Sequence, residues 1–269
     1  MSDALPVLDS DYPLTEEQIA AYRRDGHVLL PSLLSAAEVE QYRRAIIDAV
    51  ASLNREERPL EARDTYGKAF IQITNLWTKE DRLKPLVLSR RIGKVAAQLM
   101  GCDRARVYHD QALFKEPQGG PTPWHQDQHY WPLATDNTVT MWMPLVDADT
   151  SMGTMRFASG SHREGYLGDM PISDESEAMF AKFVEDRGYE IRESGAMKAG
   201  DATFHSGWTL HGALGNSSDE MREVMTIIYY PDGTRVGAVD NANRRADLEA
   251  WLPGLQPGDL AASDINPVV

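Results

Sequence analysis

The sequence predicts a mainly β protein with flanking helices, and three observations support this class. In the first hundred residues, apolar side chains recur every three or four positions, which is the period of amphipathic helices. From Ala105 onward, apolar and polar residues alternate in short runs separated by Gly, Pro, Asn and Asp, as in strands joined by turns. The 15 Pro and 20 Gly among 269 residues also indicate many turns. Short strands at this spacing favour a sandwich or a barrel.

The helical part is expected at about 15–100. Thr15 and Gln18 stand three residues apart, as do Ser35 and Glu38, and this is the spacing of a capping box at a helix start. After Ser35 the spacing predicts a helix of roughly four turns whose apolar face carries Val39, Tyr42, Ile46, Ile47 and Val50. A further helix is expected at 90–100, followed by Gly101, the residue type that a left-handed C-terminal cap prefers.

Strands are expected at 106–114, 138–146, 202–210 and 224–230. The stretch 161–195 interrupts them because it is polar and acidic, so we interpret it as an insertion with a short helix near 176–187 and as a candidate lid. The tail after Trp251 contains Pro and Gly and is expected to wrap the surface or to fray. Although 269 residues exceed the usual domain size, all-β units of this length often fold as one, so a single domain over 1–269 is expected.

Composition narrows the classes of function. A formal net charge of −14 disfavours nucleic acids and anionic membranes, because both need clustered Lys and Arg. Cys102 is the only cysteine, which excludes an intrachain disulfide and a thiolate-rich zinc site. The first residues lack the basic start and apolar stretch of a signal peptide, and no run approaches the ~18 apolar residues of a membrane span. We expect a cytoplasmic protein whose partners are small molecules.

The segment His125-Gln126-Asp127 indicates a metal site. On extended chain, residues i and i+2 point to the same face, so the imidazole and the carboxylate can reach one ion. His211 is the expected third ligand because Arg222 follows it by eleven residues, and His205 is its rival because both would lie on one face of a strand. Two imidazoles and one carboxylate leave three octahedral positions open, which suits a non-haem Fe(II) oxygenase.

These ligands together with Arg222 resemble the signature of the phytanoyl-CoA dioxygenase (PhyH) family of Fe(II)/2-oxoglutarate oxygenases. The resemblance spans about 15–230. Within this range, the segments 115–117, 159–162 and 200–202 and Trp142 also resemble the family. It implies a double-stranded β-helix, or jelly-roll, core at about 105–235. It also implies that Fe(II), 2-oxoglutarate and O2 hydroxylate a small organic substrate, with release of succinate and CO2. Asp127 argues against halogenation, because related halogenases have a small residue in place of the carboxylate.

The resemblance also implies contacts to the co-substrate. Arg222 would hold the distal carboxylate of 2-oxoglutarate, for which a guanidinium offers two parallel donors. Trp142, Gln111 and, with less support, Gln72 stand where the family supplies further contacts. A small hydroxyl residue that is common in relatives two positions after the distal histidine is Ala213 here, so Thr209 or Thr226 is the expected replacement.

Aromatic and histidine residues near the ligands are candidates for the substrate pocket, although packing alone would also explain them: His129, Tyr130, Trp131, His205 and Trp208. His109 and His162 are expected to be structural or to support the ligands. Two other functions stay open. One is a non-catalytic protein that binds metal or 2-oxoglutarate, which succinate release would exclude. The other is a metalloenzyme that needs no O2, against which Arg222 argues because such chemistry requires no carboxylate clamp.

Overall fold

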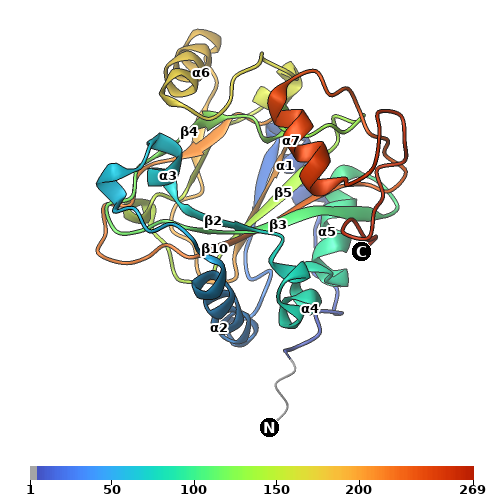
Figure 1. Ribbon diagram of the computed structural model, residues 1–269, viewed down its shortest axis with the longest axis horizontal. Helices are drawn as coiled ribbons and strands as arrows, with labels where there is room; N and C mark the ends of the chain where they lie inside the picture. Colours follow the sequence, from blue (N-terminus) through green and yellow to red (C-terminus); the bar gives the residue numbers. More distant parts are fainter. Residues whose placement is uncertain (1–4) are drawn as a thin grey trace.

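The computed structural model describes residues 5–269, which form two antiparallel sheets surrounded by helices (Figure 1). The larger sheet has the strand order β1-β8-β5-β10-β3-β2, and the smaller has the order β4-β9-β6-β7. Except for β2-β3 and β6-β7, neighbouring strands are not consecutive in the sequence, as in a jelly roll. The predicted fold class, a mainly β core with flanking helices, is therefore confirmed. Among the described residues, no helix is both long and apolar enough to cross a membrane.

The strands are short. Those of the larger sheet are β1 (His27–Leu30), β2 (Ile71–Thr74), β3 (Ala105–Phe114), β5 (Val139–Pro144), β8 (Ala202–Ser206) and β10 (Val224–Pro231). Those of the smaller sheet are β4 (Thr122–His125), β6 (Met155–Ala158), β7 (Ile191–Glu193) and β9 (His211–Ala213). Three of the four predicted strands lie close to their expected bounds.

The fourth predicted strand, 202–210, is wrong in its second half. Strand β8 ends at Ser206, and the chain turns there, with the Thr209 amide donating to the Ser206 carbonyl at 2.9 Å. Gly207 permits this turn, because a Cβ atom at this position would lie 2.3 Å from the Thr138 hydroxyl. The turn carries the chain from the larger sheet to the smaller one, so β9 begins only at His211.

Seven α-helices flank the sheets in the described part of the chain: α1 (Glu16–Asp25), α2 (Ala36–Leu53), α3 (Thr65–Ala69), α4 (Lys84–Val87), α5 (Arg90–Met100), α6 (Asp174–Arg187) and α7 (Ala242–Trp251). Short 3-10 turns lie at 60–62, 76–78, 81–83, 127–129, 150–152 and 161–164. Both predicted capping boxes are present, at Thr15 and at Ser35. Helix α2 is longer than predicted, α5 ends at Gly101 with φ +69° as expected, and α7 is a helix that the sequence pattern did not indicate.

The two faces of the larger sheet differ in chemistry because side chains alternate along each strand. One face packs against α2 and α5 and is apolar, with Ala112, Met141, Met143, Phe204, Met225 and Ile227 in the main core. The opposite face is largely polar and lines a cavity, with Gln72, Gln111, Thr140, Trp142, His205 and Thr226. Figure 1 shows α2 and α4 on one side of this sheet and α6 and α7 on the other.

The C-terminal tail does not fray. The Val269 amide donates to the Ala105 carbonyl at 3.0 Å, and the Val107 amide donates to the Pro267 carbonyl at 3.1 Å. The side-chain amide of Asn266 reaches the Val107 and Tyr108 carbonyls as well. These bonds fix the start of β3, whose later residues line the cavity.

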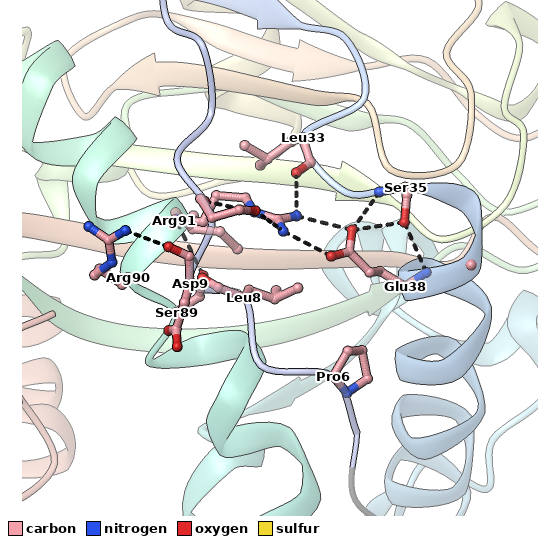
Figure 2. A network of polar contacts seen from close by, with 12 residues as sticks. Pro6, Leu8, Asp9, Leu33, Ser35, Glu38, Ser89, Arg90 and Arg91 are labelled. Atoms are coloured by element: carbon pink, nitrogen blue, oxygen red, sulfur yellow. Dashed lines mark hydrogen bonds and ion pairs between the residues drawn. The ribbon is translucent and has the colours of Figure 1, made fainter.

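An ion pair whose side chains are only 11% and 18% exposed joins the two helices under the larger sheet (Figure 2). Arg91 of α5 donates to both carboxylate oxygens of Glu38 on α2, at 3.0 and 2.9 Å, and to the Leu33 carbonyl at 3.2 Å. The Glu38 carboxylate also accepts from the amide of Ser35 at 2.7 Å, so one side chain caps α2 and anchors α5. Burial alone would raise the pKa of Glu38, but the hydrogen bonds and charge of Arg91 and Ser35 lower it overall.

We expect Glu38→Gln to lower the free energy of unfolding at pH 7 by about 2 kcal/mol, because it leaves Arg91 without its charged partner at a mostly buried site. The lowered pKa of Glu38 means that this stabilisation is present above its ordinary value of 4.5 and is lost as the pH falls through the folded-state pKa. Urea unfolding of the wild type and the variant between pH 3 and 7 should therefore converge at the acid end.

Glu40→Gln is the matched control, since Glu40 lies on the same helix in an exposed pair with Arg44. Its effect should stay below about 0.5 kcal/mol. Equal losses of unfolding free energy in the two variants, or a loss in Glu38→Gln that persists in acid, would contradict the role assigned to the Arg91–Glu38 pair.

Candidate metal centre

Three predicted ligands converge at one end of the smaller sheet. His125 is the last residue of β4, His211 is the first residue of β9, and the two are directly paired across the strands. Asp127 follows at the start of a 3-10 turn, not on extended chain, and its Oδ1 lies 3.4 Å from His125 Nε2 and 3.5 Å from His211 Nε2. The three ligand atoms lie within 4.8 Å of one another, close enough to bind a single ion.

Backbone carbonyls orient both imidazoles. His125 Nδ1 lies 2.7 Å from the Pro123 carbonyl, and His211 Nδ1 lies 2.9 Å from the Thr209 carbonyl. A carbonyl oxygen only accepts hydrogen bonds, so in each ring Nδ1 carries the proton and Nε2 offers its lone pair to a metal. The second oxygen of Asp127 accepts from the Thr140 hydroxyl at 2.9 Å, which leaves Oδ1 facing the imidazoles.

The protonation states also suit a metal. Burial lowers the pKa of His125, and nearby His211 lowers it further. Burial would raise the pKa of Asp127, but the three surrounding histidines, His211 foremost, hold it well below its ordinary value. Near neutral pH the site therefore presents a neutral imidazole at His125 and a carboxylate, which are the forms that bind a divalent ion. The donor set fits Fe(II), which accepts two imidazoles and one carboxylate on one octahedral face.

His205, the rival for the third position, lies beside the site and is not part of the converging set. Its Nε2 is 3.2 Å from Asp127 Oδ2, the oxygen turned away from the other two histidines. The reason is topological, because β8 belongs to the larger sheet whereas β9 pairs with the strand that carries His125. The preference for His211 agrees with this arrangement.

Arg222 is a buried cation that has no ion-pair partner among residues 5–269. Its side chain is 2% exposed, it donates to the Gly153 carbonyl, and its Nε has no hydrogen-bond partner within residues 5–269. Burial lowers its pKa to about 9, and it lies 5.3 Å from the centre of the Trp142 ring. Lys115 is also buried nearby, where burial and the charge of Arg222 lower its pKa to about 6. An unpaired buried guanidinium is costly, so a carboxylate of a bound ligand fits this position.

The ligands and Arg222 line one cavity of about 410 Å³. Most of the predicted co-substrate and substrate residues line it too: Gln72, Gln111, Tyr130, Trp131, Trp142 and His205. Thr226, the alternative to Thr209, is also in the lining. The lining also includes residues that the sequence analysis did not select, among them Tyr66, Phe70, His109, Ile172, Asp247 and Trp251. Of these, only His109 could have been predicted from the sequence, because it lies two residues before Gln111 on a predicted strand and therefore on the same face.

Three predicted pocket residues do not line the cavity. The Thr209 hydroxyl donates to the Gly26 carbonyl at 2.8 Å, because the turn after β8 directs it toward the end of α1. The Trp208 indole donates to Asp136 at 2.8 Å for the same reason. His129 ends the 3-10 turn and is buried outside the cavity lining, with Nε2 3.1 Å from the side-chain amide of Asn243. At Thr209 and Trp208 a turn replaced the second half of the predicted strand 202–210, and at His129 a 3-10 turn replaced the expected extended chain.

Comparison with known proteins agrees with this geometry. Residues 22–224, more than half of the chain, match the family model described as phytanoyl-CoA dioxygenase (PhyH). The probable alpha-ketoglutarate-dependent hypophosphite dioxygenase of Stutzerimonas stutzeri is 27% identical over 223 residues, which cover 79% of this chain and 77% of that protein.

Two solved structures are similar over nearly the whole chain. The non-heme alpha-ketoglutarate-dependent carbocyclase SnoK from nogalamycin biosynthesis has a TM-score of 0.75 and 27% identity, covering 96% of this chain and 97% of that one. The epimerase SnoN in complex with Fe3+, alpha-ketoglutarate and nogalamycin RO has a TM-score of 0.77 and 28% identity, covering 94% and 97%. With its two-histidine, one-carboxylate site and its jelly-roll core, the chain belongs to the phytanoyl-CoA dioxygenase (PhyH) family of Fe(II)/2-oxoglutarate-dependent oxygenases.

Proposed function

We propose that this enzyme hydroxylates a C–H bond of a small organic substrate. One O2 is consumed, 2-oxoglutarate becomes succinate and CO2, and one oxygen atom enters the substrate. The observation that carries the proposal is that the metal ligands and the unpaired Arg222 line the same buried cavity. A five-carbon diacid that reaches both would bind the metal at one end, with a position left for O2, and neutralise the guanidinium at the other.

The roles of the residues follow from their contacts. Bound iron with 2-oxoglutarate and O2 supplies the oxidising power for C–H cleavage. Thr140 and His205 hold the Asp127 carboxylate so that one oxygen stays directed at the metal position. Arg222 binds the distal carboxylate and Trp142 packs beside it. Burial strengthens both the contact of Asp127 with the metal and that of Arg222 with the carboxylate, because the effective dielectric is lower in the cavity than in water.

A chain of side-chain amides lies along the cavity wall. The Tyr66 hydroxyl donates to Gln72 Oε1 at 2.7 Å, and the Gln72 amide nitrogen donates to Gln111 Oε1. This direction leaves the Gln111 amide nitrogen free to donate to an oxygen of 2-oxoglutarate. The co-substrate contact that the resemblance implies for Gln111 is consistent with this polarity.

The segment at about 161–195 acts in the same proposal as a cover beside the metal centre. It contributes Ile172 to the cavity lining, where the Ile172 amide donates to the Tyr130 hydroxyl at 2.8 Å. Helix α6 is tied to the strand before the first ligand, because Glu177 accepts from the Trp124 amide at 2.8 Å and from Arg156 at 2.7 Å. We place this segment in the same single domain as the core.

We expect Asp127→Ala to abolish succinate formation, because it removes one of three ligands. Iron affinity should fall by more than the ~10–100-fold that loss of an outer partner costs. The measurements are iron content after anaerobic reconstitution, the visible absorption of the Fe(II)·2-oxoglutarate chelate, and succinate release after O2 is admitted. Asp264→Ala, at an exposed carboxylate, is the control and should behave as wild type. Retained turnover in the metal-reconstituted Asp127 variant would refute the ligand assignment.

We expect Arg222→Ala to weaken 2-oxoglutarate binding by about 100-fold, because a buried charge contact is lost, with little change in iron affinity. The 2-oxoglutarate affinity of Arg222→Lys should lie between those of the wild type and Arg222→Ala, because an ammonium keeps the charge but lacks the parallel donors of a guanidinium. Calorimetric titration of 2-oxoglutarate and of Fe(II) into each protein separates the two affinities. Parallel losses in both would indicate a folding defect and would speak against the clamp.

A further inference from the structure

Part of the cavity lining lies away from the metal ligands and Arg222. The backbone of Arg222 forms a β-bridge with Lys115 just beyond the end of β3, and Gln111 and His109 line the cavity farther along this strand. The six residue steps from Lys115 to His109 span about 20 Å of strand, so His109 lies far from the clamp. Helix α7 brings Asp247 and Trp251 to the same part of the lining.

This distal part of the lining contains two polar groups with spare hydrogen-bonding capacity. His109 is 6% exposed and its Nδ1 has no hydrogen-bond partner in the described part of the chain. Its ring packs against Trp251, with the ring centres 4.8 Å apart and the planes tilted by 37°. One oxygen of Asp247 accepts from the Tyr108 hydroxyl at 3.0 Å, which fixes the carboxyl group in place beside the cavity.

Aromatic rings make up much of the remaining cavity lining: Tyr66, Phe70, Tyr130, Trp131 and Trp251. Flat, rigid walls of this kind suit a ring-bearing ligand. A volume of about 410 Å³ is at the small end of ligand pockets and must also hold 2-oxoglutarate, so the part of the substrate inside the cavity is the size of one compact ring system.

Charge narrows the ligand further. Among the described residues that line the cavity, Arg222 is the only Lys or Arg, and Asp127 and Asp247 are the only acids. Because Arg222 binds the co-substrate and Asp127 binds the metal, Asp247 is the one remaining Asp, Glu, Lys or Arg side chain in the described lining. Burial raises the pKa of Asp247 to about 7, against hydrogen bonds from Tyr108 and Trp251, and burial lowers the pKa of His109 to about 4. An anionic substrate would therefore meet no cation and one acid.

We propose that the substrate is a compact ring-bearing molecule, uncharged or cationic, and that Asp247 and His109 bind a hydroxyl or amine donor on it. Asp247 is then a specificity-determining residue, and the chain differs in substrate charge from its relative named for hypophosphite, an anion. This inference rests on the proposed function, because it assigns to Arg222 and Asp127 the roles given above.

Three indole probes that differ in one group test the proposal: tryptamine is a cation, tryptophol is neutral, and indole-3-acetate is an anion. Each is titrated calorimetrically into the full-length protein loaded anaerobically with Fe(II) and 2-oxoglutarate. Tryptamine and tryptophol should bind about tenfold or more tightly than indole-3-acetate, because only they carry an ammonium or hydroxyl donor on the side chain for the carboxyl group of Asp247, whereas the indole N–H is common to all three. Equal or tighter binding of indole-3-acetate, or no binding of the two donor probes, would overturn the proposal.

Two variants locate the effect. Asp247→Asn should lower tryptamine affinity by about tenfold and change tryptophol affinity by less than about threefold, since an amide still accepts a hydrogen bond. His109→Phe, which keeps the ring and removes both nitrogens, should weaken both donor probes. Glu249→Gln, at an exposed position on the same helix, is the control and should change neither. Unchanged tryptamine affinity in Asp247→Asn would count against the proposal.

The chelate separates the two hypotheses. If the wild type forms no Fe(II)·2-oxoglutarate chelate and releases no succinate, the proposed function fails. If the chelate forms and the indole-3-acetate probe binds best, the proposed function stands and the assignment of Asp247 fails. The 2-oxoglutarate affinity of each variant is the folding control. We expect it to equal that of the wild type, because neither Asp247 nor His109 binds the co-substrate in our proposal.

Discussion

The register between β4 and β9 is the constraint on which the site depends. His125 and His211 are opposite each other in this pair, and only this pairing brings two imidazoles to one carboxylate. A shift by one residue would turn His211 to the other face of the sheet, because side chains alternate along a strand. The turn after β8 sets this register, since it decides where the chain enters the smaller sheet. The metal centre is therefore a consequence of strand topology as much as of residue identity.

The two buried charges of the cavity differ in their partners. The Asp127 carboxylate faces three histidines, whereas the Arg222 guanidinium has no carboxylate beside it among residues 5–269. A protein that leaves such a cation unpaired is less stable than one that pairs it, and a bound anion recovers this loss through mass action. The polar cavity face is tolerated because the opposite face of the same sheet packs tightly on α2 and α5, where Arg91 and Glu38 join the helices.

Substrate recognition in this chain depends on segments that are far apart in sequence. His109 comes from the middle of β3, Ile172 from the segment after β6, and Asp247 from the helix that follows the core. In our proposal, iron and 2-oxoglutarate occupy one part of the cavity, and these three segments shape the remainder. Similar proteins are named for an inorganic anion and for natural-product biosynthesis, which is consistent with such a division.

The sequence by itself determined the local features, because each depends on neighbours within a few residues. These are the capping boxes at Thr15 and Ser35, the end of α5 at Gly101, and the short alternating strands. The pattern of ligands and Arg222 also indicated the family. The tertiary structure alone decided that Thr209 faces α1, that His205 supports Asp127 without joining the three ligands, and that Asp247 reaches the cavity. These positions depend on a sheet crossing and on helix docking, and such long-range contacts leave no periodic pattern in the chain.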